Sequence, residues 1–454
     1  MIHKYRKFDH NIVVDTNSGA VHLMEQCPFD LLDFEEVRTA EKLPESILHK
    51  MERKYFKDEI ETAFSELKEL QSEDMLFSED TYSENVINMR KDSPVKALCL
   101  HIAHDCNLRC KYCFGDGGSF HGSRVMMSQK VGRAAIDFVV ARSKGRRNIE
   151  IDFFGGEPLM NFDTVKDIVC YADEQGKLHD KNFRFTITTN GILLDDDILE
   201  FINRHMHNVV LSIDGRKEIN DSIRGKGVYD QIVPKFQKAA ESRNQDNYYV
   251  RGTFTAYNLD FSKDVMHLAD LGFQQISVEP VIDKAERPWS LKEEHLPQIF
   301  EEYDRLADAY LDRIRKKKGF NFFHFMVDLS QGPCVIKRIA GCGAGCEYLA
   351  VSPEGDIYPC HQFVGLPEYK MGNVLENTLN QNIKSGFEES NIYCKDKCKD
   401  CWAKFYCSGG CLANAYKFNN DINKPHEIEC DMFQKRLECA IALYIEKQAL
   451  QEEQ

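Results

Sequence analysis

Between residues 95 and 281 the chain alternates short apolar runs with longer amphipathic stretches. Six apolar runs have the length and composition of buried strands, at residues 95–103, 148–154, 183–189, 208–213, 249–256 and 275–281. Helical patterns separate them, at residues 130–144, 162–176, 195–205, 229–242 and 261–272. Strand-then-helix units in succession predict a parallel α/β layout, open or barrel-like. As a barrel it would be a partial (β/α)6 TIM-like barrel, two units short of a closed (β/α)8 barrel. Functional side chains in such folds gather at the carboxyl ends of the strands.

The first 90 residues have a different pattern. Two short strands flank the turn Thr16–Gly19, and helical patterns follow at residues 29–37, 45–56 and 59–70. Strands with three short helices resemble a winged-helix module, which is often a DNA-binding unit. The acidic character of residues 58–74 argues against DNA here. The polar stretch 71–92 reads as a linker to the barrel.

Charge and hydropathy narrow the class of protein. The chain of 454 residues carries 58 Lys and Arg against 73 Asp and Glu, a net charge of −15. This balance disfavours a general nucleic-acid binder. No apolar run approaches the roughly 18 residues of a membrane span, and the N-terminus lacks the apolar segment of a secretory signal. We therefore expect a cytoplasmic protein with no nucleic-acid or membrane partner.

The distribution of cysteines points to bound metal. Three of the 17 cysteines lie together at Cys106, Cys110 and Cys113, none lies between Cys170 and Cys334, and eleven fall from Cys334 onward. In a large chain without a secretory signal, clustered cysteines indicate metal binding or redox chemistry rather than disulfides.

The first group follows the first barrel strand with the spacing C-x3-C-x2-C. Three thiolates can bind three corners of a [4Fe–4S] cube, which leaves the fourth iron open to a small molecule. Structural thiols, or a zinc site with a distant fourth ligand, remain alternatives on spacing alone.

The segment CNLRCKYCF at residues 106–114 resembles the signature of radical S-adenosylmethionine (SAM) enzymes. Further motifs resemble that family in the same order: GGEP at 155–158, TTNG at 188–191, SIDG at 212–215 and Arg224. The resemblance implies that Cys106, Cys110 and Cys113 bind the catalytic cluster. It also implies a set of SAM-binding residues: Tyr112, Gly155, Gly156, Glu157, Asn190, Ser212, Asp214 and Arg224.

The resemblance also implies the family's chemistry, which depends on the catalytic cluster together with SAM. In this family Glu157 is expected at the SAM amino group, Ser212 and Asp214 at the ribose, and Arg224 at the carboxylate. Reductive cleavage of SAM would supply a 5′-deoxyadenosyl radical that removes hydrogen from an unreactive carbon. The paired glycines are expected to let the backbone approach the ligand closely.

The C-terminal cysteines resemble the seven-cysteine pattern of SPASM domains, which hold two auxiliary [4Fe–4S] clusters. The resemblance assigns an outer set, Cys398, Cys401, Cys407 and Cys430. It assigns an inner set of Cys342, Cys360 and Cys411, with Cys346 as a possible fourth ligand. If Cys346 is not a ligand, the inner cluster has an open iron that a substrate thiolate could occupy. Zinc knuckles are the alternative, and Cys334 and Cys394 are extra to the pattern.

The whole chain resembles maturases of six-cysteine (SCIFF) peptides, which form thioether crosslinks of the sactipeptide and ranthipeptide type. This resemblance implies three [4Fe–4S] clusters, SAM, and an electron donor such as flavodoxin or ferredoxin. It implies that residues 1–90 bind the leader of a ribosomal precursor peptide by β-augmentation; a structural cap is the alternative. The enzyme would join a cysteine sulfur to a carbon of an acceptor residue.

Two other functions stay open at this stage. A sulfatase-maturing enzyme would oxidise Cys or Ser to formylglycine with the same clusters, and a non-catalytic iron–sulfur or zinc scaffold would not cleave SAM. The predicted division is a recognition domain at 1–90, a barrel at 91–285, a helical linker at 286–333 and a SPASM domain at 334–454. Four residues are candidates near the barrel mouth: Phe114, Arg251, Glu279 and His361.

Overall fold

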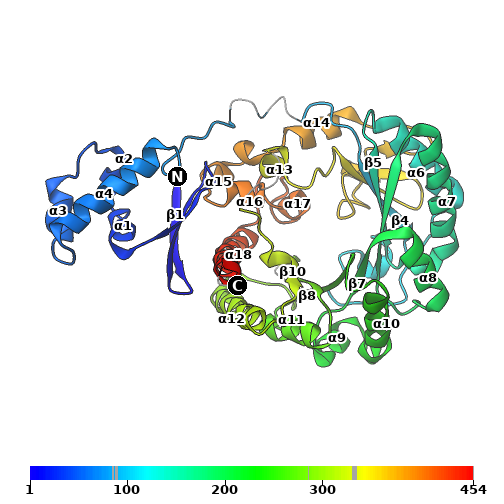
Figure 1. The fold of residues 1–454 in the computed structure, drawn as a ribbon. Helices are drawn as coiled ribbons and strands as arrows, with labels where there is room; N and C mark the ends of the chain where they lie inside the picture. The colour runs from blue at the N-terminus through cyan, green and yellow to red at the C-terminus, as the bar shows by residue number, and fades with distance from the viewer. Residues whose placement is uncertain (84–85, 87–89, 285, 330–334, 453–454) are drawn as a thin grey trace.

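The structure of the protein, a computed structural model, describes residues 1–454 except 84–85, 87–89, 285, 330–334 and 453–454. Cys334 lies outside the described residues. In Figure 1 a small N-terminal module extends to one side of a larger, curved α/β body. Among the described residues, no helix is long and apolar enough to cross a membrane.

Six parallel strands form the centre of the larger body, and all six coincide with the predicted runs. They are β4 (Ala97–Ala103), β5 (Asn148–Gly155), β6 (Asn182–Thr189), β7 (Met206–Ser212), β8 (Tyr248–Phe254) and β9 (Gln275–Pro280). Each strand pairs in parallel with its sequence neighbour. Strand β4 is buried along its whole length, which explains why it reads as a continuous apolar run, whereas β5 and β8 alternate buried and more exposed positions. The expected parallel α/β layout is confirmed.

Helices cover the outer face of this sheet, as Figure 1 shows. They are α6 (Gln129–Arg142), α7 (Phe162–His179), α8 (Asp196–His205), α9 (Lys217–Arg224), α10 (Val228–Ser242), α11 (Phe261–Asp270) and α12 (Leu296–Arg315). Five of them match predicted helices between strands, and α12 lies within the predicted helical linker at 286–333. The two-turn helix α9 was not predicted, because it is too short to display a clear period.

The C-terminal region continues the same sheet, which the sequence did not suggest. Strand β11 (Tyr348–Val351) pairs in parallel with β4, and Leu349 lies opposite Leu98. Strands β12 (Asp356–Tyr358) and β13 (Gly372–Asn373) extend that edge, and β10 (Asn321–Phe322) adds to β9 at the other edge. Strands β11 and β12 form an antiparallel hairpin before Cys360, with Gly355 in the left-handed conformation at its turn.

Helices carry most of the remaining C-terminal chain. They are α13 (Val335–Ala340), α14 (Gln381–Glu389), α15 (Asp396–Lys399), α16 (Lys404–Cys407), α17 (Leu412–Asn419) and α18 (Glu427–Glu452). Helix α18 packs against α12. Because α12 follows the last barrel strand, this contact joins the end of the chain to the barrel.

The N-terminal module begins with a three-stranded antiparallel sheet and continues with helices. Its elements are β1 (Ile2–Lys7), β2 (His10–Asp15), β3 (Val21–Met24), α1 (Gln26–Leu31), α2 (Glu36–Thr39), α3 (Glu45–Met51) and α4 (Lys57–Ser72). The strand β1 was not predicted, and the winged-helix arrangement stays a prediction. Strand β2 lies between β1 and β3, so within the described chain each outer strand has one edge without a strand partner.

The predicted linker packs against its surroundings. Leu76 and Val86 are buried. Asp80 accepts hydrogen bonds from Tyr393 and from Lys404, each at 2.7 Å. The polar composition of this stretch thus reflects specific contacts with the C-terminal region.

Candidate functional site

The loop after β4 carries the first three cysteines, at the carboxyl end of the sheet. Cys106, Cys110 and Cys113 are each partly exposed. Burial is the main cause that raises the pKa of Cys106 to about 11 and of Cys110 to about 12. The backbone N–H of Leu108 lies 3.4 Å from the sulfur of Cys106, in position to donate a hydrogen bond to it.

A cavity of about 460 Å³ opens beside this loop. It is lined by Arg109, Cys110, Asp116, Gly117, Ser119, Gly122 and Arg124. Asp105 accepts a hydrogen bond from Arg124 at 2.9 Å and also pairs with Arg109. These arginine pairs brace the loop that carries the thiols.

The GGEP glycines bring the loop after β5 against the end of β4. A Cβ on Gly155 would lie 2.4 Å from the carbonyl oxygen of Ala103, and one on Gly156 would lie 2.0 Å from that of Asp105. Both distances are far below van der Waals contact, so neither position admits a side chain. The two glycines therefore let the loop after β5 pack directly on the backbone at the end of β4. Their approach to a ligand stays a prediction.

Glu157 is fully buried and ties two strand ends together. Its carboxylate accepts hydrogen bonds from the N–H groups of Leu159 and Asn190 and from the hydroxyl of Thr189, at 2.8–3.0 Å. Burial raises the pKa of Glu157 to about 7, although these donors oppose the shift. A carboxylate offers about four acceptor positions, so three donors leave capacity for one more, such as an ammonium group.

Asn190 connects this network to the cysteine loop. Its side-chain amide donates to Asn107 at 2.8 Å and lies 3.6 Å from the sulfur of Cys106. Predicted cluster and cofactor residues from three separate strand ends are therefore connected through a few hydrogen bonds. Asn107 was not predicted as part of the site.

A second network joins three more of the predicted residues. Arg224 donates to both oxygens of Asp214 at 2.8 and 2.9 Å, and Tyr112 donates to Asp214 at 2.7 Å. The Tyr112 hydroxyl also accepts from Arg224. The structure brings these residues together, and each is buried or nearly so. Within the described residues, Nη1 of Arg224 makes no hydrogen bond, which leaves it available to a ligand carboxylate.

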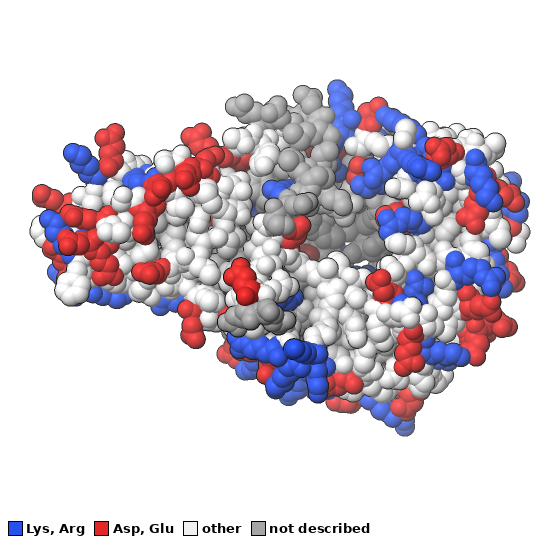
Figure 2. Space-filling model, viewed as in Figure 1, with Lys and Arg blue, Asp and Glu red and all other residues white. Residues whose placement is uncertain are grey.

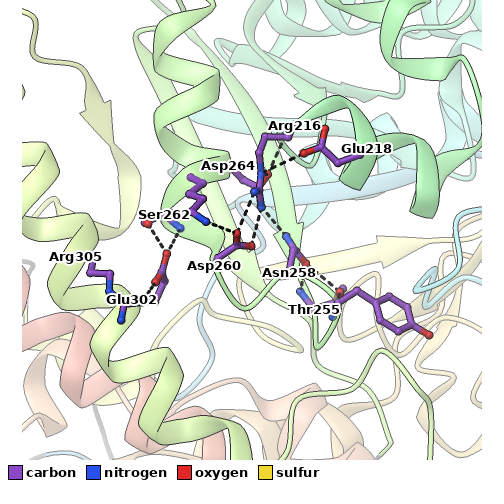
Figure 3. Close-up of polar contacts among 11 residues, drawn as sticks. Arg216, Glu218, Thr255, Asn258, Asp260, Ser262, Asp264, Glu302 and Arg305 are labelled. Atoms are coloured by element: carbon purple, nitrogen blue, oxygen red, sulfur yellow. Dashed lines mark hydrogen bonds and ion pairs between the residues drawn. The ribbon is translucent and has the colours of Figure 1, made fainter.

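The loop after β7, which holds Asp214 and Gly215, is fixed by charged side chains of Arg216 and of the segment after β8 (Figure 3). Arg216 pairs with Asp260 at 2.7 Å and with the fully buried Asp264 at 2.8 Å. A Cβ on Gly215 would lie 2.3 Å from that of Asp264, so the loop packs closely on α11. Ser212 lies next to Arg251 in register at the partly exposed end of β7.

The mouth of the barrel contains the remaining candidates. Arg251 on β8 and Glu279 on β9 form an ion pair of 2.6 Å, with side chains 48% and 34% exposed. The ring of His361 lies 5.6 Å from that of Phe114 and 5.2 Å from that of Phe154. The contact between Phe114 and His361 brings the loop that carries Cys113 close to the loop that carries Cys360. Phe154 was not predicted.

Several C-terminal cysteines lie near other members of their predicted sets. Burial is the main cause that raises the pKa of Cys430, and the nearby Cys407, Cys398 and Cys401 add to the shift. For Cys360 the neighbouring cysteines that add to the shift are Cys411 and Cys342. A cavity of about 210 Å³ is lined by Cys407, Gly410, Cys411, Pro425, His426, Glu429, Cys430 and Phe433. Thiols from both predicted sets therefore face one space.

Cys346 has different neighbours. Arg90 donates a hydrogen bond to its sulfur at 3.4 Å, and Arg90 is itself held by the carbonyls of Phe387 and Ser390. Burial raises the pKa of Cys346 to about 12, and Arg90 opposes that shift. Its role as a fourth ligand of the inner cluster stays a prediction. Cys394 is exposed, with its sulfur near Asn391 and Asn423.

The residues present fit iron–sulfur clusters and SAM. Thiols converge on cavities, glycines let the cysteine loop pack closely, and donors face the sulfur of Cys106. Among the described residues no three His, Cys, Asp or Glu side chains are grouped so as to hold a single metal ion. The assignment of ligands to each cluster therefore remains a prediction from the sequence pattern.

Two known domain families match parts of the chain and indicate its class of protein. Residues 100–256 match the radical SAM superfamily, and residues 342–402 match the SPASM iron–sulfur cluster-binding domain. The chain therefore contains a radical SAM domain followed by a SPASM domain. Together with the relatives below, these domains support an enzyme of the radical SAM, SPASM-type maturase class.

Individual relatives refine that class. The chain is 25% identical to a cysteine-type anaerobic sulfatase-maturating enzyme of Clostridium novyi (strain NT) over 76% of this chain and 95% of that protein. Its fold is similar to native anSMEcpe with bound AdoMet, with a TM-score of 0.64, 19% identity, and coverage of 78% of this chain and 100% of that one. It is also similar to Streptococcus suis SuiB bound to precursor peptide SuiA, with a TM-score of 0.52, 16% identity, and coverage of 93% and 97%.

Proposed function

We propose that this chain is a radical SAM maturase that forms intramolecular thioether crosslinks in a ribosomally made, cysteine-rich precursor peptide. The observation that carries the proposal is the N-terminal module together with the two cofactor domains. The match to anSMEcpe accounts for all of that chain but only 78% of this one, whereas the match to SuiB extends over 93%. SuiB was solved with a precursor peptide bound.

The N-terminal module supplies the features of a peptide-binding unit. The sheet β1–β3 leaves one edge of each outer strand without a strand partner in the described chain. An extended leader could add to such an edge through main-chain hydrogen bonds. Exposed acidic residues gather on α4, including Asp58, Glu59, Glu61 and Glu66, and Figure 2 shows acidic side chains over this end of the molecule. They favour a leader with some basic character.

The barrel residues would bind and orient the cofactor. Cys106, Cys110 and Cys113 would hold the catalytic cluster, Glu157 would accept from the SAM amino group, and Arg224 would donate to its carboxylate. Bound there, cluster and SAM supply a radical that removes hydrogen from a carbon of the peptide. The described contacts keep Glu157, Asp214 and Arg224 buried, so these polar groups meet a ligand in a site that largely excludes water.

The C-terminal cysteines would hold the clusters that take part in forming the carbon–sulfur bond. Cys342, Cys360 and Cys411 would hold an inner cluster near the barrel mouth, where the ring of His361 meets Phe114. Arg251 and Glu279 lie on the carboxyl ends of β8 and β9 and would contact the peptide. Joining a carbon radical to a thiolate releases one electron, and each bridge removes two hydrogens from the peptide. An electron donor such as flavodoxin or ferredoxin would reduce the catalytic cluster.

The first test is metal content. After anaerobic reconstitution, three four-iron clusters require about 12 iron atoms per chain, and replacement of Cys106, Cys110 and Cys113 by Ala should leave about 8. The same variant should lose SAM cleavage under reduction. About 4 iron atoms with several zinc ions in the parent protein would contradict the two auxiliary clusters. If the parent protein left SAM uncleaved under reduction, it would not be an enzyme of this class.

The second test separates the proposed product from formylglycine. The enzyme is incubated with cysteine-rich peptides encoded beside its gene, with SAM and reductant. Each thioether should lower the mass by about 2 Da, consume one alkylatable thiol and leave no aldehyde. An aldehyde that reacts with a hydrazide would instead identify a sulfatase-maturing type of reaction.

A further inference from the structure

Lys395 is a buried lysine in the middle of the C-terminal cysteines. It is 2% exposed, and its Nζ donates to the carbonyl oxygen of Gly409 at 2.6 Å. Gly409 lies between Cys407 and Cys411, in the short loop that links the outer cysteine set to the inner one. A Cβ on Gly409, whose φ is +88°, would lie 3.1 Å from Nζ, so this loop leaves room for the ammonium group.

The ammonium group has no carboxylate partner. Among the described residues no Asp or Glu lies within 4.0 Å of Lys395, whereas the equally buried Lys404 pairs with Asp80 at 2.7 Å. Burying a cation without a counter-charge costs free energy. The packing contacts of the Lys395 side chain alone would not offset this cost. The carboxylate of Glu429 interacts with Lys395 from beyond ion-pair distance, so close negative charge has to come from another source.

Cysteines predicted to be cluster ligands are near enough to supply that charge. Burial lowers the pKa of Lys395, and the nearby Cys398, Cys394, Cys407 and Cys411 oppose this shift. Cys398 and Cys407 belong to the predicted outer set, and Cys411 belongs to the inner set. As cluster-bound thiolates they would place negative charge of both predicted clusters near the ammonium group.

We propose that Lys395 is a shared counter-charge that raises the reduction potentials of both auxiliary clusters. The inference rests on the proposed function, because it requires those clusters. A cluster with several thiolate ligands is anionic, and one more electron makes it more so. A cation in a medium of low dielectric constant therefore stabilises the reduced form. Lys395 would ease uptake of the single electron released when a carbon radical joins a thiolate.

The test is a potentiometric titration followed by electron paramagnetic resonance. It uses the full-length reconstituted chain with Cys106, Cys110 and Cys113 replaced by Ala, so that only auxiliary clusters contribute. Lys395→Met and Lys395→Gln should shift both midpoint potentials to more negative values. Lys395→Arg, which keeps the charge, should retain the potentials of the parent protein.

Lys397→Met is the matched control. Lys397 lies two residues further along, is 66% exposed and pairs with the exposed Glu427. Solvent screens its charge, so the loss of this lysine should leave both potentials unchanged. An equal shift in Lys397→Met would overturn the specific role of Lys395.

Each other outcome also decides the question. Unchanged potentials in Lys395→Met and Lys395→Gln, with about 8 iron atoms retained, would overturn the proposal. A shift of one cluster only would overturn the shared role. Loss of auxiliary iron in both neutral variants but not in Lys395→Arg would support the need for a cation, whereas loss in all three would show a packing role. A parent protein without auxiliary iron would overturn the proposed function itself.

Discussion

At the scale of single residues, the site depends on buried polar groups that are almost completely paired. Glu157 illustrates the point, because three donors from two strand ends hold its carboxylate with no exposure to solvent. Such a group is preorganised for one further donor. Its role is open to a direct test by substitution.

Glu157→Gln should weaken SAM binding while cluster iron is retained. The amide loses the negative charge that favours an ammonium group, and a hydrogen bond to a charged group is worth about 1.5–3 kcal/mol, or roughly 10- to 100-fold in affinity. Equilibrium binding and iron analysis on the same samples measure both quantities. If iron is lost together with SAM affinity, Glu157 supports the cluster loop rather than the ligand.

Asp152 on β5 should make stability depend on pH. Burial and the neighbouring Glu150 raise its pKa from 3.8 to about 7 in the folded state, although Thr186 opposes the shift. The folded protein then binds a proton that the unfolded chain has released. Stability should therefore fall as the pH rises from about 4 to 7 and change little above that.

Asp152→Asn tests this dependence. The variant should be more stable than the parent protein at pH 8, by about 1–2 kcal/mol, and indistinguishable from it at pH 4. Anaerobic unfolding in urea at the two pH values measures the difference. Equal effects at both values would mean that Asp152 is not protonated in the folded protein.

At the scale of elements, loops at the carboxyl end of the sheet hold one another. Arg216 follows β7, and Asp260 and Asp264 belong to the segment after β8, so their ion pairs connect consecutive strand-helix units (Figure 3). The same segment contains Asn258, which donates to Asp264 at 3.0 Å. The positions of Asp214 and Gly215 thus depend on residues of the next unit.

Asp264→Ala should destabilise the protein by about 3–5 kcal/mol, because it leaves Arg216 and Asn258 without their buried acceptor. Asp230→Ala is the control: Asp230 pairs with Lys217 at 2.6 Å, but both side chains are more than half exposed. That exposed pair should contribute less than about 1 kcal/mol. Urea unfolding compares the two, and equal effects would argue against a bracing role for Asp264.

At the scale of the whole molecule, the N-terminal module is attached to the C-terminal region rather than to the barrel strands. The ring of His3 stacks on that of Trp402 with centroids 3.8 Å apart, and His3 lies 2.9 Å from Glu438 of α18. Ile12 and Val14 of β2 pack in the same cluster with residues of α18.

His3→Ala should loosen this attachment, since it removes an aromatic stack and a polar contact worth about 1–2 kcal/mol in total. Limited proteolysis within residues 73–83 should become faster, because cleavage follows the population of the opened state. His22→Ala removes a contact with Met75 inside the same module and should have a smaller effect. Equal cleavage of His3→Ala and the parent protein would contradict docking through His3.

The sequence alone determined the order of strands in the barrel, the cysteine groups and the series of motifs after successive strands. These features are local: a buried strand such as β4 is a continuous apolar run, a helix repeats every 3.6 residues, and ligand spacing lies within a few positions. Helix α9 was missed because its two turns are too short to display a period, and β1 was missed because its sequence IHKYRK is mostly polar.

Only the tertiary structure decided which distant residues meet. Nothing near Arg90 in the sequence indicates Cys346, and nothing near Lys395 indicates the carbonyl of Gly409. Likewise, β11 extends the barrel sheet beside β4, and the GGEP glycines meet the backbone of Ala103 and Asp105. Such contacts depend on how complete elements pack, since burial and desolvation act on groups brought together only in the folded chain.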